Sequence, residues 1–261
     1  MKMKVKLRVL FPIALLVALS LVTIANQREF ATEKHEIRPQ PPLQKMSVAI
    51  VGDSWATHDL IATSLANTLK VTTGQTAQVH NHGLSGARSK LVYQSLFFPI
   101  SDHRSNQSVL SEPVSYCVIF VGVNDAANRI GSDFYAFHTK KIVDSVLQRG
   151  ATPVVVLLPH FGEVEYLSTA WVPSRVKAAV FGELFDRGEL PNVDRYRIAL
   201  RGALASEEDR VVFVDPDSAL GTYDSNNKMW GNSAHPSQDG DQALGREIAE
   251  ALADRLVAPS K

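Results

Sequence analysis

Four short polar turns in this sequence carry the residue types that nucleophilic catalysis needs. They are residues 52–54 (Gly-Asp-Ser), 81–86 (Asn-His-Gly-Leu-Ser-Gly), 122–125 (Gly-Val-Asn-Asp) and 232–235 (Asn-Ser-Ala-His). A serine hydroxyl becomes a nucleophile when a base such as histidine takes its proton, and preorganised N–H donors must stabilise the oxyanion that then forms. Together the four turns could supply a nucleophile, a base and oxyanion donors.

The first turn follows an apolar run at residues 48–51, which is typical of a buried central strand. In open parallel sheets, ligands bind at the carboxyl ends of the strands, so Ser54 is a candidate nucleophile. A serine here could instead only cap the helix that follows it. The other three turns have equally ordinary interpretations, as turn glycines, a helix-capping pair and a loop histidine.

The elements that would position these turns alternate between strands and helices. Short apolar runs predict strands at 48–51, 78–80, 114–121, 153–158 and 211–214. Helical spacing of apolar residues predicts helices at 60–73, 87–97, 134–147, 194–204 and from about 239 onward. Residues 161–191 have no strong period and are interpreted as an insertion over the sheet edge, with short helices.

This alternation predicts an α/β domain with three layers, α/β/α, around a doubly wound five-stranded parallel sheet. We expect the second strand to lie on the far side of the first. That order puts a topological switch point beside Ser54, which is where this architecture binds ligands.

In their order and spacing, the four turns resemble the SGNH or GDSL hydrolases, a family named for Ser, Gly, Asn and His in four sequence blocks. The resemblance covers about residues 46–256. It implies a flavodoxin-like SGNH hydrolase fold and a serine esterase that needs no cofactor and no metal. By this resemblance Ser54 is the nucleophile and His235 the base. The oxyanion hole would consist of the N–H groups of Ser54 and Gly86 and the side-chain amide of Asn124.

One catalytic position departs from the family pattern. The family's last block is Asp-x-x-His, and Asn232 stands where the aspartate is expected. An asparagine brings no charge, and its NH2 group could favour the wrong histidine tautomer; in serine proteases this change lowers kcat by about 10⁴-fold. The site could be a Ser54–His235 dyad oriented by Asn232 or a backbone carbonyl, could recruit Asp239 or Asp215, or could be degenerate. We expect the dyad.

Composition limits the other classes of function. The 261 residues contain 27 basic and 27 acidic side chains, so the chain lacks the basic surplus of a nucleic-acid-binding protein. No Cys and His residues have zinc-site spacing. The single cysteine, Cys117, lies in an apolar run and is interpreted as a buried strand residue.

The amino-terminal residues predict export. Four basic residues precede an almost wholly apolar stretch at 9–25, so residues 1–25 are a signal peptide or an N-terminal membrane anchor. Residues 26–45 are polar and proline-containing and are interpreted as a flexible linker. Residues 46–261 would then be the hydrolase-like domain, facing the periplasm or the cell exterior, and membrane contact would involve only the N-terminal segment.

These observations predict an exported esterase that hydrolyses a short-chain ester, such as an acetyl ester on a carbohydrate. One alternative is a carbohydrate O-acetyltransferase that uses the same acyl-enzyme, and another is a degenerate binding module on the same fold. The candidate substrate contacts are Asp53, His82 and His160, together with Trp55, Trp171 and Trp230. Tryptophan rings can stack on sugars, although packing in the core explains any one of them equally well.

Overall fold

The computed structural model describes residues 28–41, 43, 45–98, 108–186, 190 and 192–257. The chain divides into two compact units, residues 1–31 and 32–261, and the second contains the predicted hydrolase-like domain. The predicted signal peptide or anchor at 1–25 lies outside the described residues. Among the helices that are described, none is both long enough and apolar enough to cross a membrane.

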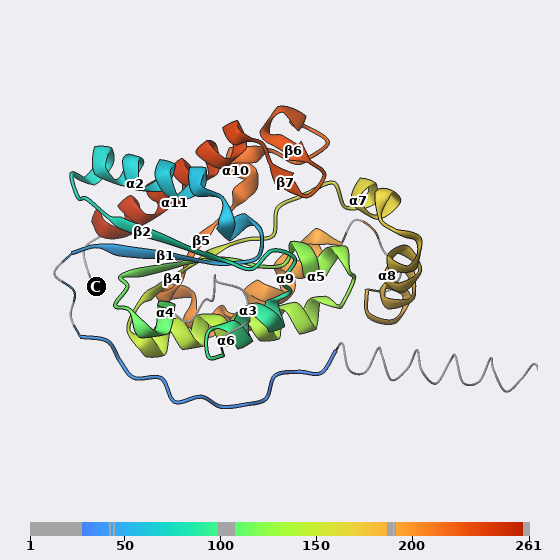
Figure 1. Ribbon diagram of the computed structural model, residues 1–261, viewed down its shortest axis with the longest axis horizontal. Helices are drawn as coiled ribbons and strands as arrows, with labels where there is room; N and C mark the ends of the chain where they lie inside the picture. Colours follow the sequence, from blue (N-terminus) through green and yellow to red (C-terminus); the bar gives the residue numbers. More distant parts are fainter. Residues whose placement is uncertain are drawn as a thin grey trace, which may run out of the picture. The chain divides into compact units, whose positions relative to one another are not determined.

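A five-stranded parallel sheet forms the middle layer of the second unit (Figure 1). Its strands are β1 (Ser47–Gly52), β2 (Gln78–Gly83), β3 (Tyr116–Phe120), β4 (Thr152–Val156) and β5 (Val212–Val214). Their order is β2-β1-β3-β4-β5, and all neighbouring pairs are parallel. The chain therefore reverses its winding direction beside β1, which confirms the predicted switch point. Cys117 is fully buried in β3, as predicted.

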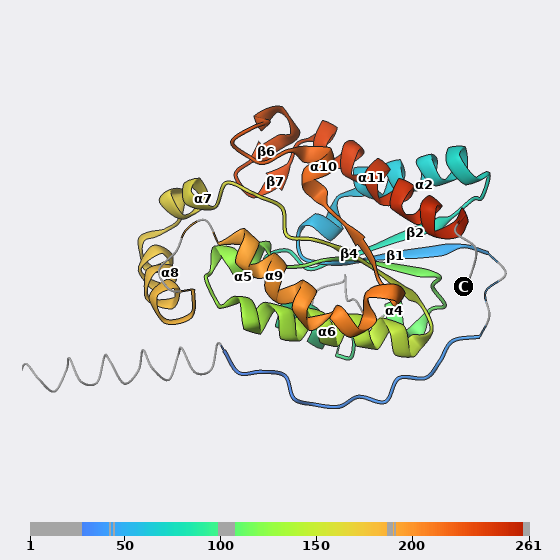
Figure 2. The same ribbon diagram turned by 180° about the vertical axis from the view of Figure 1, so that it is seen from behind.

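Helices cover both faces of the sheet (Figures 1 and 2). On one face lie α2 (Asp59–Thr73) and α11 (Gln238–Val257), which pack against each other. On the other lie α3 (Ser89–Ser95), α6 (Ser132–Arg149) and α9 (Val193–Ala203). Apolar residues spaced four apart, Ile61, Leu65 and Leu69, turn one side of α2 toward the sheet. The predicted three-layer α/β/α fold is confirmed.

Further elements complete the connections, and several surround the carboxyl ends of the strands. They are η1 (Trp55–Thr57), α4 (Ser108–Ser111), α5 (Val123–Ala127), α7 (Glu163–Thr169), α8 (Val172–Phe185), η2 (Ala205–Arg210), α10 (Pro216–Leu220), η3 (Asn227–Met229), β6 (Trp230–Asn232) and β7 (His235–Pro236). Strands β6 and β7 form a small antiparallel hairpin. Helices α7 and α8 occupy the predicted insertion at 161–191 and lie beyond the end of the sheet (Figure 1).

Part of the predicted flexible linker lies along the domain. The side chain of Gln40 both donates to the Val114 carbonyl (2.6 Å) and accepts from the Val114 N–H (2.8 Å), and its own N–H donates to the Arg149 carbonyl. The ring of His35 stacks on Phe97 with 3.8 Å between centroids. These contacts fasten residues 35–40 to the domain, so this part of the chain is not a free tether.

Candidate active site

Strand β1 ends at a position that only glycine can occupy. Gly52 has φ +150°, and a Cβ atom there would lie 1.9 Å from the Phe120 carbonyl oxygen of β3. This close approach lets the Asp53 N–H donate to the same oxygen at 2.9 Å. Ser54 follows in helical conformation at the start of η1, but its side chain makes no capping hydrogen bond. The capping interpretation of Ser54 is therefore wrong, and its hydroxyl is available for other contacts.

The hydroxyl of Ser54 meets the imidazole of His235. Ser54 Oγ lies 2.8 Å from His235 Nε2, although the two residues are 181 positions apart in the chain. The next residue, Trp55, reinforces this pairing, because its indole N–H donates to the Ala234 carbonyl at 2.9 Å. Trp55 is buried, so its predicted role in stacking on substrate is wrong. Instead, its ring holds the loop that carries His235 (residues 232–235, the histidine loop) against the loop that carries Ser54 (residues 52–54, the serine loop).

Asn232 determines which nitrogen of His235 carries the proton. Asn232 Oδ1 accepts the backbone N–H groups of Ala234 (2.9 Å) and His235 (3.0 Å), and it also lies 3.2 Å from His235 Nδ1. Because two backbone donors point at this atom, it must be the amide oxygen and not the NH2 group. The ring nitrogen facing it is therefore a donor, Nδ1–H. This tautomer leaves Nε2 free to accept the proton of Ser54.

The predicted oxyanion groups converge on the same edge of the sheet. Asn124, on α5 after β3, donates to the Ala87 carbonyl at 3.1 Å and approaches Asp53 Oδ2 at 3.4 Å. The second contact is long and weak, so this hydrogen is the one available to a bound oxyanion. Gly86 adopts φ +74°, and the N–H groups of Gly86 and Ser54 donate no hydrogen bond to any described residue. Three N–H donors thus lie at the same edge of the sheet as Ser54, and those of Ser54 and Gly86 have no described acceptor.

Two buried carboxyl groups, those of Asp53 and Asp125, lie beside these residues and accept hydrogen bonds from residues that adjoin their loops. Burial raises the pKa of Asp53 to about 7, although its Oδ1 accepts the Trp55 N–H at 3.0 Å. Burial also raises the pKa of Asp125 to about 6, against the effect of the Ser89 N–H and hydroxyl, which both donate to it. Asp53 is 1% exposed, so its prediction as a substrate contact is wrong; it orders the loop of the nucleophile.

The sequence model of the GDSL-like Lipase/Acylhydrolase family matches residues 48–243, a span that contains all four turns. The chain belongs to this family. Comparison with curated protein sequences gives no match.

Solved structures show the same fold at low sequence identity. The lipase/acylhydrolase from Enterococcus faecalis has a TM-score of 0.60 and 17% identity, over 83% of this chain and 99% of that one. A catalytic mutant of Axe2, an acetylxylan esterase from Geobacillus stearothermophilus, has a TM-score of 0.55 and 14% identity, over 84% and 96%. The acetyl xylan esterase AlAXEase has a TM-score of 0.54 and 14% identity, over 81% and 100%.

Within this GDSL-like site, replacing Asn124 with alanine is expected to lower kcat by about 10²–10³-fold with a much smaller change in KM. The reason is that the amide strengthens its contact only as negative charge develops in the transition state. Steady-state kinetics with p-nitrophenyl acetate measure both constants. Asn128→Ala is the matched control, because the Asn128 amide lies one turn further along and, among the described residues, bonds only the Asn124 backbone carbonyl. A rise in KM at constant kcat would remove Asn124 from the oxyanion hole.

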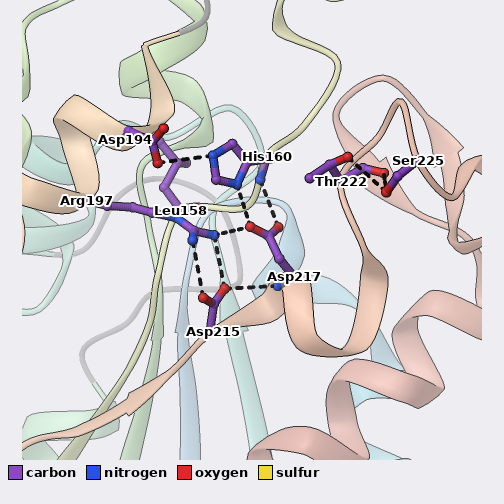
Figure 3. Close-up of polar contacts among 8 residues, drawn as sticks. All are labelled: Leu158, His160, Asp194, Arg197, Asp215, Asp217, Thr222 and Ser225. Carbon is purple, nitrogen blue, oxygen red and sulfur yellow. Dashed lines mark hydrogen bonds and ion pairs between the residues drawn. The ribbon is translucent and has the colours of Figure 1, made fainter.

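Neither of the two carboxylates that the sequence offered as substitutes for the family aspartate contacts His235. Asp215 is bonded to the guanidinium of Arg197 at 3.1 Å (Figure 3). Asp239 lies on the exposed side of the first turn of α11, and its carboxylate has no hydrogen bond to a described residue. Both predicted substitutions are therefore wrong, and Asn232 is the residue that faces the ring.

A second histidine beside His235 was missed by sequence reasoning. The ring of His58 lies 5.9 Å from that of His235, at an angle of 25° between the planes, and its Nδ1 is 2.8 Å from Asp241 Oδ1. The bond to Asp241 raises the pKa of His58. Burial lowers the pKa of His235, the neighbouring His58 lowers it further, and Asp241 raises it. The only sequence signal was a histidine four residues after the nucleophile.

His160 belongs to an ionic network at the end of β4 (Figure 3). Its Nδ1 lies 2.5 Å from Asp217 and its Nε2 3.2 Å from Asp194, while Arg197 bonds Asp217 at 2.6 Å. His160 also lines a cavity of about 610 Å³. A hydrogen bond of 2.7 Å from the Gly162 N–H to the carbonyl of residue 233 connects this region to the His235 loop. Substrate contact by His160 stays a prediction.

The remaining candidate contacts lie in different environments. Trp230 is 6% exposed and packs edge-on against Trp55, so it belongs to the packing of the histidine loop and its predicted stacking on substrate is wrong. His82 is half-buried on β2 in register with Val51, and burial lowers its pKa. Trp171 is 76% exposed at the start of α8. Substrate contacts by His82 and Trp171 stay predictions.

Proposed function

We propose that this protein is a serine esterase in which Ser54 attacks the acyl carbon of a short-chain ester and His235 is the general base. The observation that carries the proposal is the 2.8 Å contact between Ser54 Oγ and His235 Nε2, with Asn232 Oδ1 on the other ring nitrogen. A nucleophile, a base and a group that orients the base are what activation of a serine requires. Membership of the GDSL-like family supports acyl transfer as the reaction class.

In the proposed mechanism, the proton of the Ser54 hydroxyl moves to His235 Nε2 while Oγ bonds to the acyl carbon. The N–H groups of Ser54 and Gly86 and the amide of Asn124 stabilise the oxyanion. When the intermediate collapses, the bond to the alkoxy oxygen breaks and the proton on Nε2 leaves with the alcohol. Water, deprotonated by the same nitrogen, then attacks the acyl-enzyme and releases the acid and free Ser54.

Asn232 performs one of the two tasks of the family aspartate. As an acceptor fixed by two backbone donors, it orients His235 in the tautomer that the mechanism needs. It carries no charge, so it cannot stabilise the imidazolium as a carboxylate does. The reaction therefore depends on another source of negative charge or proceeds at a reduced rate.

The proposed substrate is an acetyl ester on a carbohydrate. Two structural neighbours act on acetylated xylan according to their names. The wall of the cavity of about 610 Å³ beside the loop that carries His235 includes polar and aromatic side chains, such as His160, Glu165 and Tyr223, which can hydrogen-bond to a sugar and stack on it. Export, as predicted from residues 1–25, is part of this proposal, since export would bring the enzyme to cell-envelope polysaccharides. Recovery of the protein in the membrane or extracellular fraction checks this export.

The test compares p-nitrophenyl acetate, p-nitrophenyl octanoate and acetylated xylan as substrates of the purified protein. We expect kcat/KM for acetate to exceed that for octanoate by about tenfold or more, and acetate to be released from the xylan. A preference for octanoate would refute the short-chain assignment. Transfer of acetyl to an added oligosaccharide in place of water would make the protein an acetyltransferase. Absence of both hydrolysis and labelling by a fluorophosphonate probe would refute the esterase altogether.

A further inference from the structure

The proposed reaction creates a positive charge on His235 that nothing bonded to its ring neutralises. In the described part of the chain, the hydrogen-bond partners of this ring are Ser54 and Asn232, both uncharged. The half-buried position of His235 further disfavours the imidazolium, because burial lowers its pKa. A carboxylate close to the ring would lower the energy of the transition state, even without a bond to it.

Such a carboxylate is bonded to the neighbouring ring, that of His58. Asp241, in the first turn of α11, is 7% exposed, and its side chain bonds His58 Nδ1 at 2.8 Å. The ring of His58 is nearly parallel to that of His235, with 5.9 Å between centroids. Helices α2 and α11 pack side by side on the same face of the sheet, and this packing fixes the pair in place (Figure 1). Because Asp241 is buried and His58 is half-buried, solvent and salt screen the charge of Asp241 less than that of an exposed carboxylate.

We propose that Asp241, held in place by His58, supplies the negative charge that stabilises the His235 imidazolium and so replaces the carboxylate that Asn232 lacks. This inference rests on the proposed esterase function. No proton passes to Asp241 or His58: the proton from Ser54 stays on His235 Nε2 until it leaves with the alcohol. Asp241 acts through its field, and His58 acts by holding Asp241, so both are positioning residues.

The charge of the pair depends on pH through His58. His58 faces Asp241 on α11, Asp53 and Asp59 on the serine loop and α2, and His235 on the hairpin. Above the pKa of His58 its ring is neutral, and the negative charge of Asp241 acts on His235 uncompensated. Below that pKa the ring is positive and cancels the charge. Since the bond to Asp241 raises the pKa of His58, we expect kcat to fall first in a partial step above pH 6.5 as pH is lowered.

A double-mutant cycle at pH 8 tests the proposal, using Asp241→Asn in the natural chain and in an Asn232→Asp background. We expect Asp241→Asn to lower kcat for p-nitrophenyl acetate about tenfold in the natural chain. In the Asn232→Asp background, where His235 has its own carboxylate, the same change should cost less than about twofold. Equal losses of kcat in both backgrounds would mean that Asp241 has only a structural role, which would refute the proposal. An unchanged kcat in the natural chain would refute it too.

Asp239→Asn is the matched control, because it removes a carboxylate from the same turn of α11 on its exposed side. Its kcat should stay within about twofold of the natural chain. Circular dichroism and thermal unfolding establish that each variant is folded. Should Asp241→Asn fail to fold, His58→Gln takes its place: its side chain cannot become positive, so the partial step in kcat above pH 6.5 should disappear. Persistence of that step would refute the role of His58.

A readout without turnover separates this proposal from the proposed function. Titration of the His235 imidazole by NMR should give a lower pKa in His58→Gln/Asp241→Asn than in His58→Gln, because the Asp241 charge is then removed in a background where no His58 charge can cancel it. An unchanged pKa of His235 in a folded variant overturns the proposal whether or not the enzyme is active. Failure of the esterase function is seen independently, as absence of fluorophosphonate labelling in the natural chain.

Discussion

Replacing Ser54 with alanine is expected to lower kcat/KM for p-nitrophenyl acetate by about 10⁵-fold or more. The change removes the only hydroxyl that contacts His235 Nε2 in the described part of the chain, and loss of a catalytic serine costs about 10⁶-fold in kcat in a related type of site. The side chain is small and makes no capping bond, so the fold should be unaffected. Kinetics and labelling by a fluorophosphonate probe both measure the loss.

Ser64→Ala is the matched control for this experiment. Ser64 lies ten residues further along, on α2, and its hydroxyl donates to the Gln242 carbonyl away from the catalytic edge. We expect its kcat/KM to change by less than about twofold and its labelling to remain complete. If Ser54→Ala kept a substantial part of the activity or remained labelled, another residue would be the nucleophile and the assignment of the site would be wrong.

The architecture could be predicted because its signals are local. Each strand is a short apolar run between two polar segments, and burial on both faces of a parallel sheet produces that pattern. The insertion at 161–191 gave no clear helical period because much of its apolar surface is exposed: Trp171, Val172 and Val176 are more than half exposed. Its helices α7 and α8 therefore could not be located from a pattern that assumes apolar residues face a core.

The position of the candidate catalytic groups could be predicted for a related reason. Ser54 and Asn124 each follow directly after a strand, and parallel strands bring their carboxyl ends to one edge. The proposed replacement for the family carboxylate, Asp241, could not be found in this way. Asp239 and Asp241 lie about 200° apart around α11 because each residue turns the helix by about 100°. Which of the two faces the site depends on how the helix packs, and sequence spacing alone does not fix that.

The tautomer of His235 was also beyond the reach of sequence. An asparagine can present either its oxygen or its NH2 group to a ring, and the residue type does not decide between them. At Asn232 the decision comes from the backbone, whose N–H groups at residues 234 and 235 both point at Oδ1. The neutral side chain that made the site look impaired is thereby fixed in the orientation that catalysis needs.

Replacing His235 with alanine is expected to lower kcat/KM by about 10⁵-fold, nearly as much as loss of Ser54. The two residues act as one unit, since the hydroxyl is a poor nucleophile unless the imidazole takes its proton. The double variant Ser54→Ala/His235→Ala should therefore be no less active than either single variant. His80→Ala, which removes an exposed imidazole on β2, is the control and should keep full activity. Multiplied losses in the double variant would mean that the two residues contribute independently.

The same base determines where activity is lost at low pH. In the proposed mechanism His235 works only as neutral imidazole, which is the form present above its pKa. Burial and the neighbouring His58 lower that pKa below the ordinary value of 6.5, so the active range extends further into acid than for an ordinary histidine. We measure kcat/KM from pH 4 to 9. As pH is lowered, the main loss of kcat/KM, which continues toward zero, should therefore have its midpoint below pH 6.5. A midpoint above pH 7 would mean that the essential base is not the half-buried ring of His235 but a group whose charged form the protein favours.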